Sequence, residues 1–298
     1  MNALPPRLNR KEAKVHIDGK TRLIGILGDP VAHSLSPRMQ NAAFQAAGLN
    51  FCYVPLRVKQ KQLPAAVEGL RAMQFRGANV TIPHKVPAAE LLDCLDRSAA
   101  RTGAVNTIVN DAGKLTGYNT DGAGFIAALA EAVSVEFPSA TAVILGAGGA
   151  ARSVAVALAE KGVPRIAIIN RTLAKARGLK ALLKLEFPDI EAVAVGLKEK
   201  CDDLIISSKL LVNATSLGMD GDLKRLPVAV DKLTEGHIVC DLVYGGPGDT
   251  ALLAAAREKG ATLMGGLGML LHQGAASFKL WTSAQPPIEV MRKALESQ

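Results

Sequence analysis

A glycine-rich turn between an aliphatic strand and a helix is the feature that most constrains the fold of this chain. The segment 141–162, TAVILGAGGAARSVAVALAEKG, has Gly146 and Gly148 in the first two positions of G-x-G-x-x-G/A and Ala151 in the third. The first glycine permits a tight turn, the second lets the backbone approach a pyrophosphate, and the small third residue lets helix and strand pack closely. Because a second strand is expected at 165–171, the pattern predicts a dinucleotide-binding unit with phosphates at the helix N-terminus. A glycine-rich turn without a ligand is the alternative.

The end of that second strand indicates which dinucleotide binds. An NAD site has an acidic residue there, whose carboxylate accepts hydrogen bonds from the ribose 2′-hydroxyl. This chain instead has IAIINRTLAKA, which contains no acid and supplies Asn170, Arg171, Thr172 and Lys175. A guanidinium can donate two charge-assisted hydrogen bonds to a 2′-phosphate, whereas a carboxylate would repel it. The sequence therefore predicts NADP as the cofactor; an exposed arginine after a strand is the plainer interpretation.

Strand-like and helical segments alternate along almost the whole chain. Strands are expected at 22–28, 51–56, 77–82 and 104–110 before the glycine-rich unit, and at 210–215, 237–243 and 261–266 after it. Helices are expected over 36–48 with Ser36 as the N-cap, over 61–72, from about 125 to Val133, over 249–259, and in the last forty residues. This alternation is typical of α/β proteins whose mostly parallel sheets are covered on both faces.

Length and composition fit two soluble domains. A chain of 298 residues exceeds what one core comfortably serves. Aromatic residues make up only 4%, whereas aliphatic residues are abundant, as in buried parallel strands. We infer a discontinuous first domain, which the terminal helices rejoin.

The net charge of +8 is unevenly spread and argues against several classes of partner. Residues 1–22 contain six basic and two acidic residues, which we interpret as a solvated arm and not as a nucleic-acid contact. The modest excess elsewhere suits an anionic small molecule or a phosphorylated cofactor. No apolar core follows the basic start and no long apolar span occurs, so neither a secretory signal nor a membrane partner is expected.

The cysteines and histidines do not have the spacing of a metal site or a disulfide framework. Cys52, Cys94, Cys201 and Cys240 are far apart in the chain, and the five histidines also lack ligand spacing. We expect reduced thiols in a cytoplasmic protein, and no metal.

The segment GANVTIPHK (77–85) raises the question of what Lys85 does just after a strand. Pro83 removes a backbone donor and holds Ile82 extended, so the chain is expected to leave the sheet there. In α/β proteins, ligands bind beyond the carboxyl ends of strands. Taken alone, however, a loop lysine is most simply a solvated charge.

Seven motifs in order decide the question. GDPVAHSLSPRMQN, GANVTIPHK, GAVNT and GYNTDGAGF precede the glycine-rich turn, and NATSLGM, DLVYGGPGDTALL and GLGMLLHQGAASFKLWT follow it. The series, from about Val15 to Trp281, resembles the shikimate dehydrogenase family. That resemblance implies reversible reduction of 3-dehydroshikimate to shikimate with NADPH, a step toward chorismate and the aromatic amino acids. It also implies a substrate-binding domain over 1–121 and 266–298, and a Rossmann-type NADP-binding domain over 122–265.

The resemblance assigns roles residue by residue. Lys85 and Asp121 match the catalytic pair of the family. Residues that hold the substrate's carboxylate and hydroxyls, or line its pocket, are matched by Ser34, Ser36, Asn79, Thr81, Asn106, Tyr244 and Gln273. The cofactor site is matched by Gly146, Gly148, Gly149, Ala150, Asn170, Arg171, Thr172 and Lys175, together with Thr215 and Gly266.

These residue types suit the implied chemistry. Oxidation of a secondary alcohol needs a group that removes the hydroxyl proton, and a lysine that does so as general base contributes about 10²–10⁴-fold in rate. Asp121 would orient the amine and hydrogen-bond the same hydroxyl. Amide and hydroxyl side chains suit a polyhydroxylated ring, because a missing substrate hydroxyl would leave them unpaired.

Two departures from the family pattern and two alternative functions remain. Gln40 stands where the family usually has a histidine, and YGGPGDT is one residue longer between Tyr244 and Pro247.

One alternative is a quinate-type dehydrogenase that uses NAD or NADP, or a relative for another cyclic hydroxy acid. The other is a catalytically silent sensor whose basic arm binds nucleic acid. The sequence leaves a homodimer open.

Overall fold

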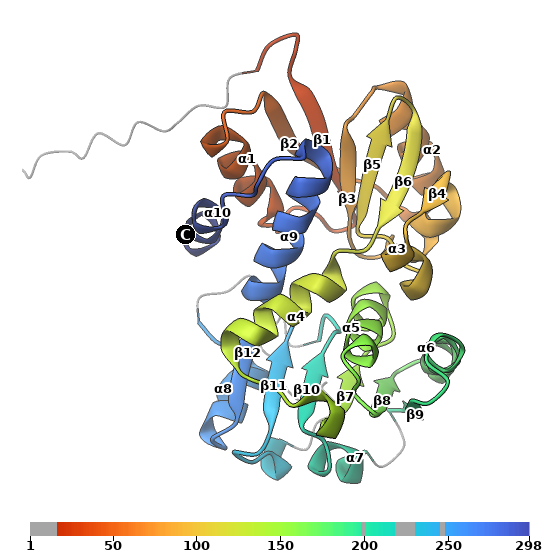
Figure 1. The fold of residues 1–298 in the computed structure, drawn as a ribbon, viewed down its shortest axis with the longest axis vertical. Coiled ribbons are helices and arrows are strands. Elements are labelled where there is room, and N and C mark those ends of the chain that lie inside the picture. The colour runs from red at the N-terminus through yellow and green to blue at the C-terminus, as the bar shows by residue number, and fades with distance from the viewer. Residues whose placement is uncertain (1–16, 198–200, 218–229, 245–247, 298) are drawn as a thin grey trace, which may run out of the picture.

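The structure, a computed structural model, describes residues 17–197, 201–217, 230–244 and 248–297. Two six-stranded sheets, each covered by helices, form the two halves of the molecule (Figure 1). The α/β fold class expected from the sequence is confirmed. The basic residues Arg7, Arg10, Lys11 and Lys14 of the N-terminal arm lie outside the described residues. Within the described part of the chain, no helix has the length and apolar character that crossing a membrane requires.

The first sheet has the order β2-β1-β3-β5-β6-β4. Its strands are β1 (Arg22–Gly28), β2 (Phe51–Arg57), β3 (Gly77–Val80), β4 (Cys94–Leu95), β5 (Thr107–Asp111) and β6 (Lys114–Tyr118). Three of the five pairings are parallel, and β5 runs antiparallel to both β3 and β6. The helices between these strands are α1 (Ser36–Ala46), α2 (Leu63–Ala72) and α3 (Arg97–Thr102).

The second sheet is parallel throughout, in the order β12-β11-β10-β7-β8-β9. Its strands are β7 (Thr141–Leu145), β8 (Arg165–Asn170), β9 (Glu191–Gly196), β10 (Leu210–Asn213), β11 (Ile238–Asp241) and β12 (Thr262–Gly265). Its connecting helices are α5 (Gly149–Glu160), α6 (Leu173–Glu186), α7 (Asp202–Ile206) and α8 (Ala251–Glu258). Aliphatic side chains fill both faces of this sheet, which is why its strands read as continuous apolar runs.

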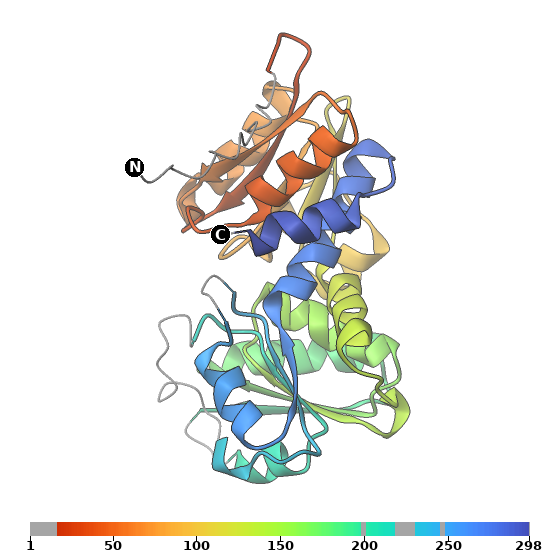
Figure 2. The same ribbon diagram turned by 90° about the vertical axis from the view of Figure 1, so that its left-hand side faces the viewer.

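Helices α4 (Asp121–Ala132) and α9 (Gly266–Thr282) lie side by side between the two sheets in both views (Figures 1 and 2). Their crossing is very close. A methyl group built on Gly124 would lie 2.6 Å from the backbone nitrogen of Gln273, and one on Gly268 would lie 3.1 Å from the Cβ of Ala128. Glycine is therefore required at 124 for the two backbones to approach this far, whereas a methyl group at 268 would need its neighbour to move by only a few tenths of an ångström.

The C-terminal helices pack against the first sheet. Phe278 and Trp281 of α9 and Met291 of α10 (Ile288–Glu296) share a buried cluster with Ile24 and Tyr53. Trp281 is 1% exposed and donates a hydrogen bond from its indole nitrogen to the carbonyl of Ile108, at 2.9 Å. The domain boundaries expected near 121 and 266 stay a prediction.

Several expected boundaries are wrong. The N-cap of α1 is Leu35, not Ser36; Ser36 is the first helical residue, and its backbone N–H donates to the Ser34 hydroxyl at 3.3 Å. β3 ends at Val80, two residues early, because a turn begins at Thr81, where the carbonyl accepts from the His84 N–H. β5 begins at Thr107, not at 104.

Candidate active site

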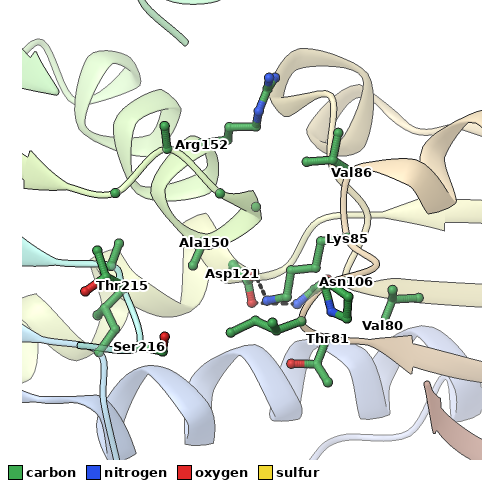
Figure 3. A pocket seen from close by; sticks show the side chains of 18 of the residues that line it. Val80, Thr81, Lys85, Val86, Asn106, Asp121, Ala150, Arg152, Thr215 and Ser216 are labelled. Carbon is green, nitrogen blue, oxygen red and sulfur yellow. Dashed lines mark hydrogen bonds and ion pairs between the residues drawn. The ribbon is translucent and has the colours of Figure 1, made fainter. Parts of the chain in front are cut away.

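A cavity of about 770 Å³ lies between the two halves, lined by residues of both. Seventeen of the predicted site residues line it; among the predicted set, Ser34 and Thr172 do not. Figure 3 shows Lys85 and Asp121 at its centre, with Thr81 and Val80 on one side and Thr215 and Ser216 on the other. The structure thus brings segments far apart in the sequence into one site.

The Lys85 ammonium and the Asp121 carboxylate form an ion pair inside this cavity. Lys85 Nζ donates to Asp121 Oδ2 at 2.5 Å, and the two side chains are only 15% and 4% exposed. Burial reduces the competition from water, so a charge pair here interacts more strongly than one at the surface. The amine and the carboxylate are therefore held together where a substrate hydroxyl could reach both.

Asn106 holds the other oxygen of Asp121. Its side-chain nitrogen donates to Asp121 Oδ1 at 2.8 Å, to the Thr120 hydroxyl at 2.8 Å and to Gln273 Oε1 at 3.2 Å. Its side-chain oxygen accepts from the backbone N–H of Thr120 at 2.8 Å. This network fixes the orientation of the carboxylate at the start of α4 and ties it to α9.

Asn79 is embedded in the protein by the same kind of contacts. Its side-chain oxygen accepts from the Tyr53 hydroxyl at 2.7 Å, and its nitrogen lies 2.9 Å from the Asn106 carbonyl and 3.1 Å from the Thr107 hydroxyl. Buried amides are costly unless such bonds are made. Asn79 thus supports Asn106, and a direct role toward a substrate stays a prediction.

The glycine-rich turn has the shape that the sequence predicts. Gly146 has a φ of +106°, which favours glycine, and Gly148 precedes the first residue of α5. A methyl group on Gly148 would meet nothing within 4 Å, so open space faces the backbone where a pyrophosphate is expected. Together with the N-terminus of α5, this cradle fits the phosphates of a dinucleotide.

The basic residues at the end of β8 lie at the same cavity. Asn170, Arg171 and Lys175 line it, and the Asn170 side chain donates to the Thr172 carbonyl at 2.9 Å, which holds the turn into α6. Arg171 and Lys175 are exposed. These cations fit the 2′-phosphate of NADP, and their individual roles stay predictions.

Several cavity residues were missed by the sequence reasoning. Arg152 of α5 is one; its guanidinium donates to the Thr102 carbonyl at 3.3 Å across the cavity wall, and burial lowers its pKa. Figure 3 shows it reaching from α5 toward the segment of Val86. Its position in the first turn after the glycine-rich loop was a usable signal. Ile82, Ser216 and Met269 also line the cavity but carry no pattern that marks them.

The two departures from the family pattern fall outside the cavity lining or the described residues. Gln40 is fully buried, and its side-chain nitrogen donates to the Gly274 carbonyl at 2.9 Å, so it joins α1 to α9. The extra residue after Tyr244 lies outside the described residues. Among the described residues, no group of three or more His, Cys, Asp and Glu side chains could hold a metal ion.

Fold and site together define a dinucleotide-binding α/β protein with a buried lysine–aspartate pair at its cofactor cavity. Family models identify it further. The shikimate dehydrogenase substrate-binding domain matches residues 26–108, the shikimate/quinate 5-dehydrogenase model matches 128–216, and the shikimate 5′-dehydrogenase C-terminal domain matches 266–296. The chain belongs to the shikimate dehydrogenase family, as its motifs predicted.

Individual relatives agree along the whole chain. The shikimate dehydrogenase (NADP(+)) of Rubrobacter xylanophilus is 46% identical over 285 residues, covering 95% of this chain and 98% of that protein. The shikimate 5-dehydrogenase of Thermus thermophilus, solved with NADP(H) and shikimate, is 38% identical with a TM-score of 0.79, covering 92% and 98%. A quinate dehydrogenase of Corynebacterium glutamicum in complex with NAD is 31% identical with a TM-score of 0.81, covering 92% and 98%.

Tyr244 gives this site a measurable pH signature. Burial raises the pKa of its phenol, and the charge of Asp121 raises it further. Above about pH 10, the pKa of an unperturbed tyrosine, the unfolded chain loses a proton that the folded chain keeps, so stability falls as pH rises.

We therefore expect the melting temperature of the Tyr244→Phe variant to fall less between pH 8 and pH 11 than that of the wild type. Melting curves at both pH values measure it, and the pH 8 values supply the baseline for packing changes. The Cys240 thiol, whose pKa burial raises to about 12, acts in the same direction but equally in both proteins. Parallel pH curves for the two proteins would contradict the prediction.

Proposed function

We propose that this chain is a cytoplasmic, NADP-dependent shikimate dehydrogenase that interconverts shikimate and 3-dehydroshikimate. The observation that carries the proposal is the buried Lys85–Asp121 pair, 2.5 Å apart, in the same cavity as the glycine-rich turn and the basic end of β8. The NADP-dependent relatives support the cofactor. Cys52 and Cys240 are buried as thiols, which is compatible with a reducing compartment.

In this proposal Lys85 acts as the general base. In the oxidation direction its neutral amine takes the proton from the substrate hydroxyl, and in reduction the ammonium returns that proton to the new alkoxide oxygen. Asp121 holds the amine in place, and Asn106 holds Asp121. When bound along the glycine-rich turn and the basic end of β8, NADP would supply the hydride acceptor for oxidation and, as NADPH, the hydride donor for reduction.

The remaining polar residues orient the substrate. Ser36, Thr81 and Gln273 line the cavity around the ion pair, and each offers a hydroxyl or an amide. A polyhydroxylated ring can satisfy these groups, whereas an analogue that lacks a hydroxyl would leave a buried polar group unpaired. We therefore assign them to the substrate's carboxylate and hydroxyls, with Tyr244 along the pocket wall.

A quinate-type activity is the second candidate, because a quinate dehydrogenase in complex with NAD shares the fold at 31% identity. Arg171 and Lys175 favour NADP over NAD as the cofactor. No acidic residue follows β8 that could accept a hydrogen bond from the free 2′-hydroxyl of NAD.

Initial rates of shikimate and quinate oxidation, each with NADP and with NAD, test the proposal. We expect shikimate with NADP to give the highest kcat/KM, measured as the absorbance of the reduced nicotinamide. Comparable quinate oxidation with NAD would favour the second candidate. NADPH binding without turnover of either acid would favour a ligand sensor.

Replacement of Lys85 by alanine tests the catalytic role. We expect kcat for shikimate oxidation to fall by about 10²–10⁴-fold with little change in the KM for shikimate, because the base is lost while the substrate contacts remain. Lys180→Ala, on the exposed side of α6, is the control for the loss of one positive charge. An unchanged kcat in Lys85→Ala would contradict the assignment of Lys85 as the general base.

Replacement of Arg171 by alanine tests cofactor selection. Hydrogen bonds to a charged group contribute about 1.5–3 kcal/mol, so the KM for NADP should rise by roughly 10- to 100-fold while the KM for NAD barely changes. Lys180→Ala again controls for net charge on the neighbouring helix. Equal loss with both cofactors would show that Arg171 does not read the 2′-phosphate.

A further inference from the structure

The glycine-rich turn of the second half lies directly against the side chain of Lys85 in the first. A methyl group built on Gly149 would lie 2.6 Å from Lys85 Cβ, 2.9 Å from Cδ and 3.2 Å from Cγ. The first two distances are shorter than carbon atoms tolerate. Since Cβ is bonded to the backbone, moving the flexible end of the lysine alone cannot relieve the overlap.

The neighbouring glycine provides the contrast. A methyl group on Gly148 would meet nothing within 4 Å. The two adjacent glycines therefore face different things: Gly148 faces open space in the cavity, and Gly149 faces the catalytic candidate itself. The G-x-G-x-x-G/A pattern explains why Gly148 is small, but it places no such demand on the residue that follows it.

The Lys85 side chain is confined at both ends. Its backbone carbonyl accepts from the Val105 N–H at 2.7 Å, and its amine is bound to Asp121. A lysine has a flexible four-carbon stem, which would otherwise sample many rotamers. The Gly149 backbone bounds the stem on the side of the second half, between the Lys85 backbone and the amine at Asp121.

We propose that Gly149 is a positioning residue for Lys85, which couples the pyrophosphate loop to the proton-transfer group. The proposal rests on the function proposed above. Contact with Gly149 holds the amine at the Asp121 carboxylate, in reach of the substrate hydroxyl. A larger residue displaces either the Lys85 segment, backbone included, or the loop, and we assign the displacement to the Lys85 segment, because the turn is fixed by the start of α5.

The Gly149→Ala variant tests this directly. Gly149 is the first residue of α5 and does not have a positive φ, so alanine fits the backbone and the helix. A displacement of about 1 Å at a reacting group costs on the order of 10²-fold in rate. We expect kcat for shikimate oxidation to fall by about that factor, while the dissociation constant of NADPH, measured by its fluorescence, changes less than about threefold.

Gly148→Ala is the matched comparison, with the same change one residue away. Its methyl group enters the space expected for the pyrophosphate, so the dissociation constant of NADPH should rise more in this variant than in Gly149→Ala. Loss of NADPH affinity in Gly149→Ala, with kcat unchanged, would overturn the proposal and leave Gly149 as an ordinary phosphate-loop residue.

A double mutant separates positioning from general disturbance. If Gly149 acts through Lys85, the Gly149→Ala change should cost no further rate when Lys85 is already glycine, which lacks the Cβ atom that the new methyl group would meet. Additive losses would overturn the proposal.

A crystal structure of Gly149→Ala decides the question even if the wild type oxidises neither acid and the proposed function fails. A Lys85 Nζ to Asp121 Oδ2 separation well beyond 2.5 Å supports positioning by Gly149. An unchanged ion pair overturns it.

Discussion

The close crossing of α4 and α9 is the constraint on which the site depends. The two helices approach through Gly124 and Gly268, and the approach lets Asn106 bond both Asp121, in the first turn of α4, and Gln273 of α9. Helix α9 belongs from Leu270 onward to the cluster under the first sheet, whereas α4 packs with Met269 of α9 into the core of the second sheet. A side chain at Gly124 would separate the two backbones and with them the polar network that orients the carboxylate.

Burial strengthens the hydrogen bonds of this polar network and also makes any unpaired polar atom in it destabilising. Asn79, Asn106 and Asp121 are each no more than 5% exposed, and in such surroundings an unpaired polar atom costs about 1–3 kcal/mol. Each makes the contacts it needs with other residues of the protein. The carboxylate is therefore oriented before any substrate arrives, so the reaction does not have to supply the energy of reorganising it.

The sequence predicts those parts of the fold that local rules decide. The β7–turn–α5–β8 unit could be read in full, because turn, strand and helix signals lie next to one another. The hairpin of β5 and β6 was missed. In the structure, Ala112 and Gly113 both adopt the positive φ typical of a tight hairpin turn. In the strand KLTGY, the alternation of apolar and polar residues is too weak to predict a strand from the sequence alone. Its pairing with β5 stabilises the extended conformation that its own residues do not specify. The α1 cap was misjudged because a serine at a helix start can occupy either of two adjacent positions.

For the site, the sequence indicates which residue types are present, but it does not indicate which side chains contact one another. Lys85 and Asp121 were found through a series of motifs. Nothing in the sequence indicates that Gly149 touches the stem of Lys85, because the two residues come from different halves of the molecule. The same holds for Asn79, whose amide is turned toward Tyr53 and Asn106 by packing. The proposed phosphate loop and the proposed proton-transfer lysine, which could act independently, are in van der Waals contact here. Any shift of the loop when phosphates bind must therefore reach the lysine, because close-packed atoms transmit displacement.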